Sequence, residues 1–248
     1  MTNVSENNTR VAIVTGGSGG IGQAVAERLA ADGMKVVVHY SSKRALADDV
    51  VRRIEDSGGS AVAAGGDVAD EADMSSLFHE AEEHFGGVDV VAHTAGILAR
   101  STLADLDLNE LDQILRINVR GTFVVDQQAV RKVREGGAII NFSTSVNQRS
   151  VPTYSAYSAS KGAVDAITMI LAKELRGRDI TVNTVAPGPT ATSMFLDSND
   201  QATVDTLAAM TALGRLGRPQ DVADVVSFLA GPARWINGQV LCANGGLI

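Results

Sequence analysis

The sequence predicts an α/β protein with a doubly wound, three-layer architecture, in which helices cover both faces of a seven-stranded parallel sheet. Short, nearly continuous apolar runs alternate along the chain with longer amphipathic stretches. Strands that are apolar on both faces are typical of parallel sheets buried beneath helices. The alternation of strand and helix implies right-handed crossovers between parallel strands. The strands are expected at residues 11–15, 35–40, 60–65, 88–93, 137–142, 180–186 and 238–243.

The organisation of the chain favours one domain over residues 10–248. A chain of 248 residues is long enough to bury one large core. No Pro- or Ser-rich linker interrupts the alternating pattern. Residues 1–9 are polar, and we expect them to form a flexible N-terminal tail. The first helix is expected over residues 23–33, where Gly33 is suited to end it.

Charge and composition argue against several kinds of partner. The chain has 21 basic and 29 acidic residues, hence a net charge of −8, and no basic run that would favour nucleic acid or an anionic membrane. The single Cys242 allows neither an internal disulfide nor a cysteine-based zinc site. No metal site is expected, because His79 and His84 are five residues apart and point off one helical face. With no long apolar segment and no signal peptide, we expect a cytoplasmic protein.

A glycine-rich turn connects the first expected strand to the first helix. The segment VAIVTGGSGGIGQAVAERLA contains Gly16, Gly17, Gly19, Gly20 and Gly22. Glycines let the backbone turn sharply and approach a diphosphate, whose charge then lies at the amides of a helix N-terminus. GxGxxG alone is a weak signal, but its place after the first strand indicates dinucleotide binding. A tight turn without a ligand is the alternative.

The same turn also reads TGxxxGxG through Thr15, Gly16, Gly20 and Gly22. This pattern resembles the short-chain dehydrogenase/reductase family, and the resemblance extends from about Arg10 to Ile248. It is nearest to members similar to 3-oxoacyl-[acyl-carrier-protein] reductases and glucose dehydrogenases. The resemblance implies a Rossmann-type sheet and a nicotinamide dinucleotide that contacts the turn, Ser18 and Ile21 included.

The end of the second strand decides between the two nicotinamide cofactors. A carboxylate there would bind the 2′-hydroxyl of NAD(H) and repel a 2′-phosphate. This chain instead has His39, Tyr40, Ser41, Ser42, Lys43 and Arg44. Hydroxyl and cationic groups suit a phosphate, so NADP(H) is favoured over NAD(H). A solvated loop that leads into a basic helix start is the alternative.

The resemblance assigns further cofactor contacts along the chain. It places Asp67 and Val68 at the adenine, Ala95 and Gly96 where the cofactor needs room, and a later segment at the nicotinamide. That segment contains Pro187, Gly188, Thr190 and Thr192, with Thr192 as the partner of the carboxamide. Family members usually have Asn-Asn-Ala-Gly where this chain has His93-Thr94-Ala95-Gly96. His93 is open to a ligand or acid/base role, but a hydrogen-bonded structural role is favoured.

The segment YSAYSASKG, residues 154–162, carries the candidate proton donor. Tyr157 and Lys161 are four residues apart and therefore share a helical face, whereas Tyr154 would pair with Ser158. Hydride reduction of a ketone leaves an alkoxide that must be protonated, and a free tyrosine has a pKa of about 10. We expect the Lys161 ammonium to lower the pKa of Tyr157. By resemblance, Lys161 also binds the nicotinamide ribose.

The resemblance supplies two more catalytic positions. The substrate-orienting serine of the family lies 13 residues before the tyrosine, which is Thr144 here. Ser143 and Ser145 flank it, and strand alternation turns both away unless a bulge brings Ser145 inward. Asn118 matches the asparagine that perturbs its helix and holds a water for proton relay. Asn118, Thr144, Tyr157 and Lys161 form the expected catalytic tetrad.

These features favour NADPH-dependent reduction of a small-molecule ketone such as a 3-oxoacyl thioester. Oxidation of a sugar or another secondary alcohol is the alternative reaction. A nucleotide-sensing regulator without turnover is the alternative of another class, and the complete tetrad argues against it. We expect residues 193–215 to form a lid over the substrate. Apolar side chains such as Met194 and Met210 would either face the substrate or pack the lid onto the body of the protein. By resemblance, a homotetramer would form through residues 108–133, residues 157–176 and the last strand.

Overall fold

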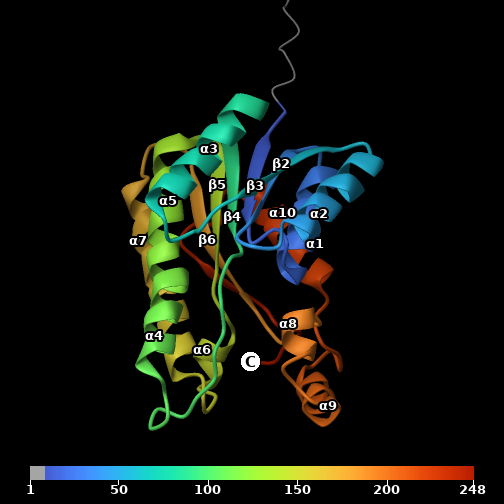
Figure 1. The fold of residues 1–248 in the computed structure, drawn as a ribbon, viewed down its shortest axis with the longest axis vertical. Coiled ribbons are helices and arrows are strands. Elements are labelled where there is room, and N and C mark those ends of the chain that lie inside the picture. The colour runs from blue at the N-terminus through green and yellow to red at the C-terminus, as the bar shows by residue number, and fades with distance from the viewer. Residues whose placement is uncertain (1–8) are drawn as a thin grey trace, which may run out of the picture.

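The computed structural model describes residues 9–248, so nearly all of the expected tail at residues 1–9 lies outside the described residues. All seven strands form one parallel sheet in the order β3-β2-β1-β4-β5-β6-β7 (Figure 1). This arrangement confirms the predicted seven-stranded parallel sheet. The strands are β1 (Val11–Thr15), β2 (Lys35–Tyr40), β3 (Ser60–Gly65), β4 (Val88–His93), β5 (Val133–Phe142), β6 (Thr181–Pro187) and β7 (Val240–Ala243).

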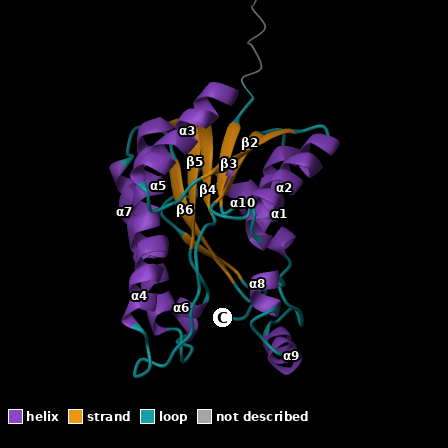
Figure 2. Ribbon diagram, in the orientation of Figure 1, coloured by secondary structure: helices purple, strands orange, loops and turns teal. Residues whose placement is uncertain are grey.

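Helices cover both faces of the sheet and bury a separate apolar core on each (Figure 2). Successive strand residues alternate between the two cores, as Ile13 and Val14 do in β1. One face packs against α1 (Gly20–Ala31), α2 (Arg44–Asp56) and α10 (Pro219–Ala230). The other packs against α3 (Glu71–Phe85), α5 (Gly121–Lys132) and α7 (Ser155–Glu174). The expected three-layer architecture is therefore present.

Shorter elements extend beyond the ends of the strands. They are α4 (Leu108–Ile114), the π-helical segment η1 (Leu115–Arg120), α6 (Val146–Arg149), α8 (Ser193–Leu196) and α9 (Gln201–Met210). The expected helix over 108–133 is thus one run of α4, η1 and α5. No helix within residues 9–248 is long and apolar enough to span a membrane.

The strands β5 and β7 and the helix α1 begin two or more residues away from their expected starts. β5 begins at Val133 rather than at residue 137, since its pairing with β4 shifts register between Val88 and Val90. β7 begins at Val240, because the preceding Gly238 has φ 68 and donates its N–H to Val182 O. α1 begins three residues earlier than expected, at Gly20.

The end of α1 follows the sequence prediction. Gly33 has φ 88, a left-handed conformation that glycine adopts without steric cost. Its N–H donates to Ala30 O at 2.9 Å, and the next amide, of Met34, donates to Leu29 O at 3.1 Å. These two bonds satisfy carbonyls that the last helical turn leaves free.

The strand order places a crevice beside β1. β1 pairs with β2 on one side and with β4 on the other, so the chain reverses its direction of winding there. In open α/β sheets, ligands bind outside the carboxyl ends of the strands at such a reversal. The glycine turn after β1 and the loop after β4 both lie at this point.

Candidate active site

The glycine turn after β1 is packed too closely for side chains. Gly16 has φ 65, and a Cβ added there would lie 2.9 Å from Ala95 Cα. A Cβ on Gly22 would collide with Gly16 O. The turn therefore packs tightly against its own first residue and against the loop after β4. Because it carries no side chains there, its backbone can approach a ligand closely.

The amides at the start of α1 are available for an anion. Gly19 occupies the N-cap position of α1, and no side chain caps the helix. The first amides, those of Gly20, Ile21 and Gly22, therefore carry the positive end of the helix dipole without an internal partner. Ser18 is partly exposed, and its carbonyl accepts a hydrogen bond from Gln23 at 2.9 Å. This arrangement suits the diphosphate of a dinucleotide.

Tyr157, Lys161 and Thr144 meet where β5 ends beside α7. The Thr144 side chain interacts with the Tyr157 phenol and favours its ionised form. Lys161 Nζ lies 6.0 Å from the Tyr157 ring centroid and donates to Phe142 O at 2.8 Å. Both Thr144 and Lys161 are buried. The spacing argument for Tyr157 thus corresponds to a real cluster of three functional groups.

The neighbouring serines have different partners. Ser143 Oγ donates to the backbone carbonyl of Lys161 at 3.3 Å. The amide of Ser145 donates to Pro187 O at 3.0 Å, and its side chain is buried. Within this run, Thr144 is the residue whose side chain interacts with the Tyr157 phenol. β5 ends at Phe142 and Ser145 has αR dihedral angles, so the alternation of a continuing strand does not apply here.

The pKa of Tyr157 differs from the expectation. Burial raises the pKa of Tyr157 to about 12, and the interaction with the Thr144 side chain only partly offsets this. The expected lowering by Lys161 is wrong for this arrangement, because the ammonium lies beside the ring and is bonded to Phe142 O. Burial also lowers the pKa of Lys161 to about 8, against the opposing charge of Asp165. Near neutral pH, Tyr157 therefore holds its proton firmly.

Asn118 lies in η1 and anchors the loop after β4. Its Oδ1 accepts from the Ile97 amide at 2.9 Å, and its Nδ2 donates to Ile97 O at 2.9 Å and to Ser160 Oγ at 3.0 Å. A Cβ on Gly96 would lie 3.1 Å from Asn118 Oδ1 and 3.2 Å from Lys161 Nζ. Gly96 thus lets Asn118 and Lys161 converge. A π-helical turn at this position is typical of a functional site.

His93 has a structural partner. Its Nδ1 lies 2.7 Å from Thr15 Oγ1, while the buried Nε2 has no hydrogen-bond partner. Burial lowers the pKa of His93 to about 3, with a smaller effect from the charge of Lys161. Thr94 Oγ1 donates to Thr15 O at 2.6 Å beside it. A neutral imidazole that joins β4 to β1 agrees with the favoured structural role.

Comparison with known proteins connects this geometry to a family. A family model described as "Enoyl-(Acyl carrier protein) reductase" matches residues 16–248. A protein of Picea abies named "Short-chain type dehydrogenase/reductase" is 42% identical, over 96% of this chain and 92% of that protein. The chain belongs to the short-chain dehydrogenase/reductase family.

Other members of this oxidoreductase family are similar over the same length. NADPH-dependent aldehyde reductase 2 of Arabidopsis thaliana is 41% identical, over 96% of this chain and 94% of that protein. A Burkholderia cenocepacia short chain dehydrogenase, solved in complex with NADP, superposes with a TM-score of 0.90 at 40% identity, covering 97% of this chain and 98% of its own. The Serratia marcescens short-chain dehydrogenase/reductase gives 0.91 at 36% identity, covering 96% and 97%.

The loop after β2, where family members distinguish the two cofactors, is open and lacks a carboxylate. Ser41, Ser42 and Lys43 are exposed, and the first turn of α2 contains no acidic residue. A Cβ on Gly65 would lie 3.0 Å from the Tyr40 hydroxyl, so the Tyr40 ring packs over β3. This loop therefore presents hydroxyls, a lysine and a helix N-terminus, which are all groups that can bind a phosphate.

The loop after β3 holds a charged aspartate. Burial alone would raise the pKa of Asp67, but hydrogen bonds from Arg116 and the Ala69 amide hold it below its ordinary value. Arg116 Nη2 lies 2.6 Å from Asp67 Oδ2. Val68 is buried against Gly121, where a Cβ would lie 2.9 Å from Val68 Cγ2. The contact between Arg116 and Asp67 was not predicted from the sequence, because no local pattern connects residues 67 and 116.

The segment after β6 borders both the glycine turn and the tetrad. Pro187 accepts the Ser145 amide, and Thr190 Oγ1 donates to Gly188 O at 2.9 Å. Thr192 caps α8 through its side chain. A Cβ on Gly20 would lie 2.8 Å from the Thr192 methyl carbon. The expected nicotinamide segment thus lies against the start of α1.

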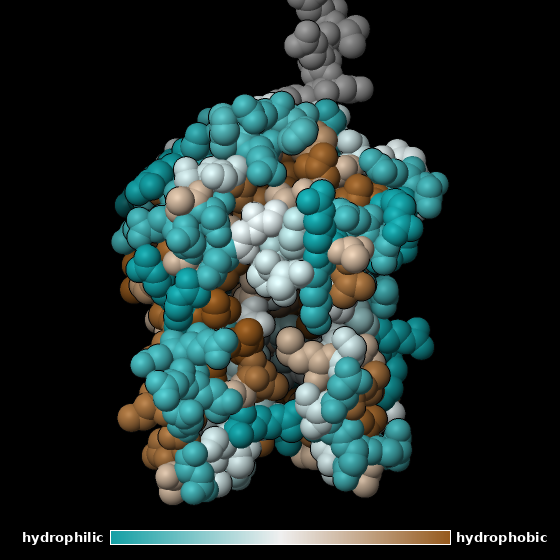
Figure 3. Space-filling model, viewed as in Figure 1, coloured by the Kyte–Doolittle hydropathy of each residue, from teal (hydrophilic) through white to brown (hydrophobic). Residues whose placement is uncertain are grey.

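The expected lid, residues 193–215, forms α8 and α9 on one side of a hollow. Figure 3 shows the front face hollowed between this region and the opposite wall, with apolar side chains on both sides. Met194 and Met210 are exposed there. Arg100, on the loop after β4, donates to Asn199 Oδ1 at 3.0 Å and lies 5.3 Å from the Tyr154 ring centroid. Arg100 therefore connects the two walls, a contact that the sequence did not reveal.

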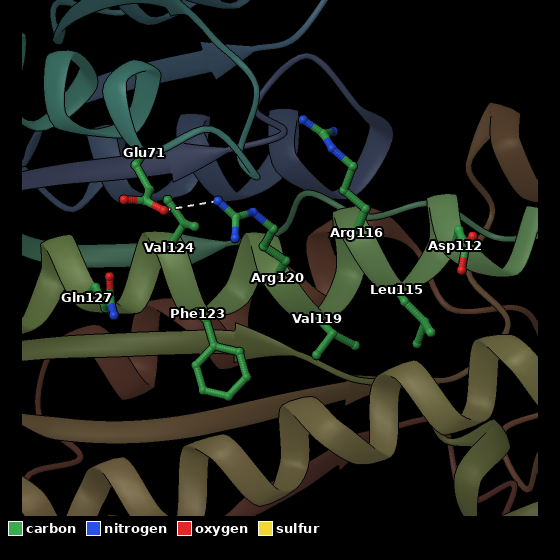
Figure 4. Close-up of a pocket in the computed structure, with 9 residues that line it drawn as sticks. All are labelled: Glu71, Asp112, Leu115, Arg116, Val119, Arg120, Phe123, Val124 and Gln127. Atoms are coloured by element: carbon green, nitrogen blue, oxygen red, sulfur yellow. Dashed lines mark hydrogen bonds and ion pairs between the residues drawn. The ribbon is translucent and has the colours of Figure 1, made fainter. Parts of the chain in front are cut away.

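The described part of the chain shows no group of three or more His, Cys, Asp or Glu side chains suited to a metal ion. A cavity of about 600 Å³ lies instead along the outer side of η1 and α5 (Figure 4). Leu115, Val119 and Phe123 point to one side of it, whereas Arg120 reaches Glu71 at 3.0 Å on the other. Because it lies along the exposed side of these helices, this cavity is separate from the tetrad.

Proposed function

We propose that the protein catalyses NADPH-dependent reduction of a carbonyl compound, with Tyr157 as the proton donor. The observation that carries this proposal is the cluster of Thr144, Tyr157 and the buried Lys161, whose Nζ lies 6.0 Å from the Tyr157 ring centroid. A hydroxyl next to a phenol and an ammonium is the set of groups that stabilises and then protonates a developing alkoxide. The bound cofactor would supply the hydride.

Each tetrad member has a distinct task in this proposal. The Thr144 hydroxyl donates a hydrogen bond to the carbonyl oxygen and fixes its orientation. Tyr157 transfers its phenolic proton to that oxygen as negative charge develops. Lys161 would bind the nicotinamide ribose close to the Tyr157 ring. Asn118 holds the Gly96 loop and so places that loop beside Lys161.

The preference for NADP(H) rests on the loop after β2. Its exposed hydroxyls and lysine offer hydrogen bonds and positive charge to a 2′-phosphate. Relatives support this choice, since the Burkholderia cenocepacia dehydrogenase was solved with NADP and a metagenomic blue fluorescent protein, 36% identical, with NADPH. Two Arabidopsis thaliana relatives are named as NADPH-dependent aldehyde reductases.

For the substrate we propose a ketone such as a 3-oxoacyl thioester. The exposed apolar side chains of residues 193–215 suit an acyl chain or another apolar body. Oxidation of a sugar or another secondary alcohol would use the same groups in reverse, with Tyr157 as the base. Relatives named as versicolorin reductases, from Emericella nidulans and Aspergillus parasiticus, extend the test panel to polycyclic ketones.

The experiment is a screen of the purified protein with both cofactors. Absorbance at the nicotinamide band reports turnover of 3-oxoacyl thioesters, aldehydes, polycyclic ketones and, in reverse, sugars. We expect reduction with NADPH and weaker activity with NADH. Binding of NADPH without turnover of any compound would favour the sensing regulator instead, and a strong NADH preference would overturn the assignment of the loop after β2.

We further propose a cytoplasmic homotetramer in which each subunit is one domain over residues 10–248. Large apolar side chains are exposed along the expected interface helices, among them Phe123 on α5 and Ile170 on α7. Trp235, just before the last strand, is 99% exposed. Exposed apolar surface of this extent supports a subunit contact. Light scattering on the purified protein measures the assembly directly, and a monomeric mass would contradict the proposal.

A further inference from the structure

His39, the residue before the end of β2, is buried, and both of its ring nitrogens have partners. The Gly16 amide donates to Nδ1 at 3.2 Å, and Nε2 lies 3.0 Å from Gly66 O. Because Nδ1 accepts, the hydrogen must be on Nε2, which then donates to the carbonyl. The ring is therefore a neutral imidazole in one defined tautomer. Burial, which lowers the pKa of His39 to about 4, agrees with this state.

One side of the imidazole holds the glycine turn. Gly16 is the first residue of that turn, and the next amide, of Gly17, donates to the main-chain oxygen of His39 at 2.8 Å. Gly16 O in turn accepts from the Gly19 amide at 2.9 Å, one residue before α1 begins. Two successive hydrogen bonds thus connect His39 to the backbone at the start of α1, so the position of His39 affects the position of those amides.

The other side of the imidazole holds the loop after β3. Gly66 O accepts from His39, and the Gly66 amide donates to Tyr40 O at 3.0 Å. Asp67, whose carboxylate is expected at the adenine, follows directly. One side chain therefore bridges the carboxyl ends of β1 and β3, which lie on opposite sides of β2 in the sheet.

We propose that His39 is a positioning residue for the nicotinamide cofactor. Its imidazole sets the separation between the glycine turn, which would hold the diphosphate, and residues 66–68, which would hold the adenine. His39 does not reach the tetrad, so its effect falls on cofactor binding rather than on chemistry. The inference rests on the proposed function only in that the chain binds NADP(H).

Two substitutions separate the two hydrogen bonds. His39→Leu removes both at similar volume, whereas the Oδ1 atom of His39→Asn takes the place of Nδ1 toward Gly16 but its amide stops short of Gly66 O. His84→Asn is the matched control, because His84 is exposed on α3. The dissociation constant of NADPH is measured from its fluorescence on binding, and that of adenosine 2′-phosphate by competition. Thermal unfolding without ligand reports the structural effect of each change.

We expect His39→Leu to weaken NADPH binding at least about tenfold, the effect of losing a buried hydrogen bond, with a smaller loss for His39→Asn. The loss is expected to be larger for NADPH, which spans both loops, than for adenosine 2′-phosphate, which lacks the diphosphate. Turnover at saturating NADPH stays within about twofold of the wild type, and His84→Asn changes nothing.

Unchanged NADPH affinity in a destabilised His39→Leu protein would show that the ring only supports the fold, and would overturn the proposal. If His39→Leu does not fold, an unchanged affinity of His39→Asn for both ligands overturns it equally. A wild-type protein that binds NADPH but reduces nothing would contradict the proposed function and leave the role of His39 standing. A wild-type protein that does not bind NADPH would contradict both the proposed function and the role of His39.

Discussion

Asn141 on β5 donates from Nδ2 to Asp126 Oδ2 on α5 at 3.0 Å, and the other oxygen of each side chain is buried without a partner. Burial raises the pKa of Asp126 to about 7, although the bond from Asn141 opposes this. A proton on the free Asp126 oxygen would let it donate to the free Asn141 oxygen. The pair is therefore complete only when the carboxyl is neutral.

This pairing predicts that Asp126→Asn stabilises the protein above neutral pH. Between the ordinary pKa of 3.8 and about 7, the folded state binds more protons at this carboxyl than the unfolded state, so the free energy of unfolding falls as pH rises. An amide at residue 126 stays neutral and can satisfy both atoms of Asn141. We expect a gain on the order of 2 kcal/mol at pH 8 that shrinks toward pH 5.

Denaturant unfolding at both pH values measures this change. Asp112→Asn, an exposed change on α4 in the same helical run, is the control and should have little effect at either pH. Equal or lower stability of Asp126→Asn at pH 8 would contradict the neutral pairing.

Tyr157→Phe removes the proposed proton donor and keeps the ring. We expect kcat to fall by about 10²- to 10⁴-fold, the usual contribution of a positioned acid, while the dissociation constant of NADPH stays nearly unchanged. Tyr154→Phe is the control, since its ring lies 6.2 Å from that of Tyr157. Steady-state kinetics and NADPH fluorescence give the two numbers, and full turnover in Tyr157→Phe would disprove the assignment.

Thr144 and Ser145 can be distinguished by two alanine variants. Thr144→Ala loses the hydroxyl that interacts with Tyr157, so we expect kcat/KM to fall by about 10²-fold, as for one oxyanion donor. Thr144→Ser keeps the hydroxyl and should retain most activity. Ser145→Ala should be nearly silent. A larger loss in Ser145→Ala than in Thr144→Ala would reverse the assignment.

Ser41→Asp tests the cofactor preference. A carboxylate in the exposed loop after β2 repels a 2′-phosphate and accepts from a 2′-hydroxyl. We expect KM for NADPH to rise at least about tenfold and KM for NADH to fall. Ser75→Asp, an exposed change on α3, adds the same charge elsewhere and controls for net charge. If the two variants had equal effects on the KM for NADPH, this loop would not be the binding site of the 2′-phosphate.

The pH dependence of reduction should follow Lys161 rather than Tyr157. Burial lowers the pKa of Lys161 to about 8 and raises that of Tyr157 to about 12. Since the ammonium is lost first as pH rises, we expect kcat/KM for the carbonyl substrate to decline above about pH 8. A profile that stays flat to pH 10 would show that Lys161 keeps its proton throughout that range.

The sequence predicts the sheet and the composition of the site because both depend on local patterns. Apolar runs mark strands wherever they lie, and Tyr157 and Lys161 are one helical turn apart whatever surrounds them. The register shift that extends β5 back to Val133 depends on its neighbour β4 and leaves no local pattern.

Contacts between distant segments are what the sequence could not supply. The bond between Arg116 and Asp67, and the one between Arg100 and Asn199, each join segments far apart in the chain. The pKa of Tyr157 likewise depends on contacts between distant segments. Its value depends on how deeply the phenol is buried and on where the Lys161 ammonium lies, and both are properties of the packed interior.

The π-helical turn of η1 determines more than the position of Asn118. Such a turn holds about one residue more than an α-helical turn, so the helix beyond it is rotated by roughly 100° relative to an uninterrupted helix. The rotation that directs Asn118 inward therefore also decides which side of α5 carries the exposed Phe123. The inward position of Asn118 and the exposed position of Phe123 both depend on this turn. A change that removed the turn would therefore move both side chains.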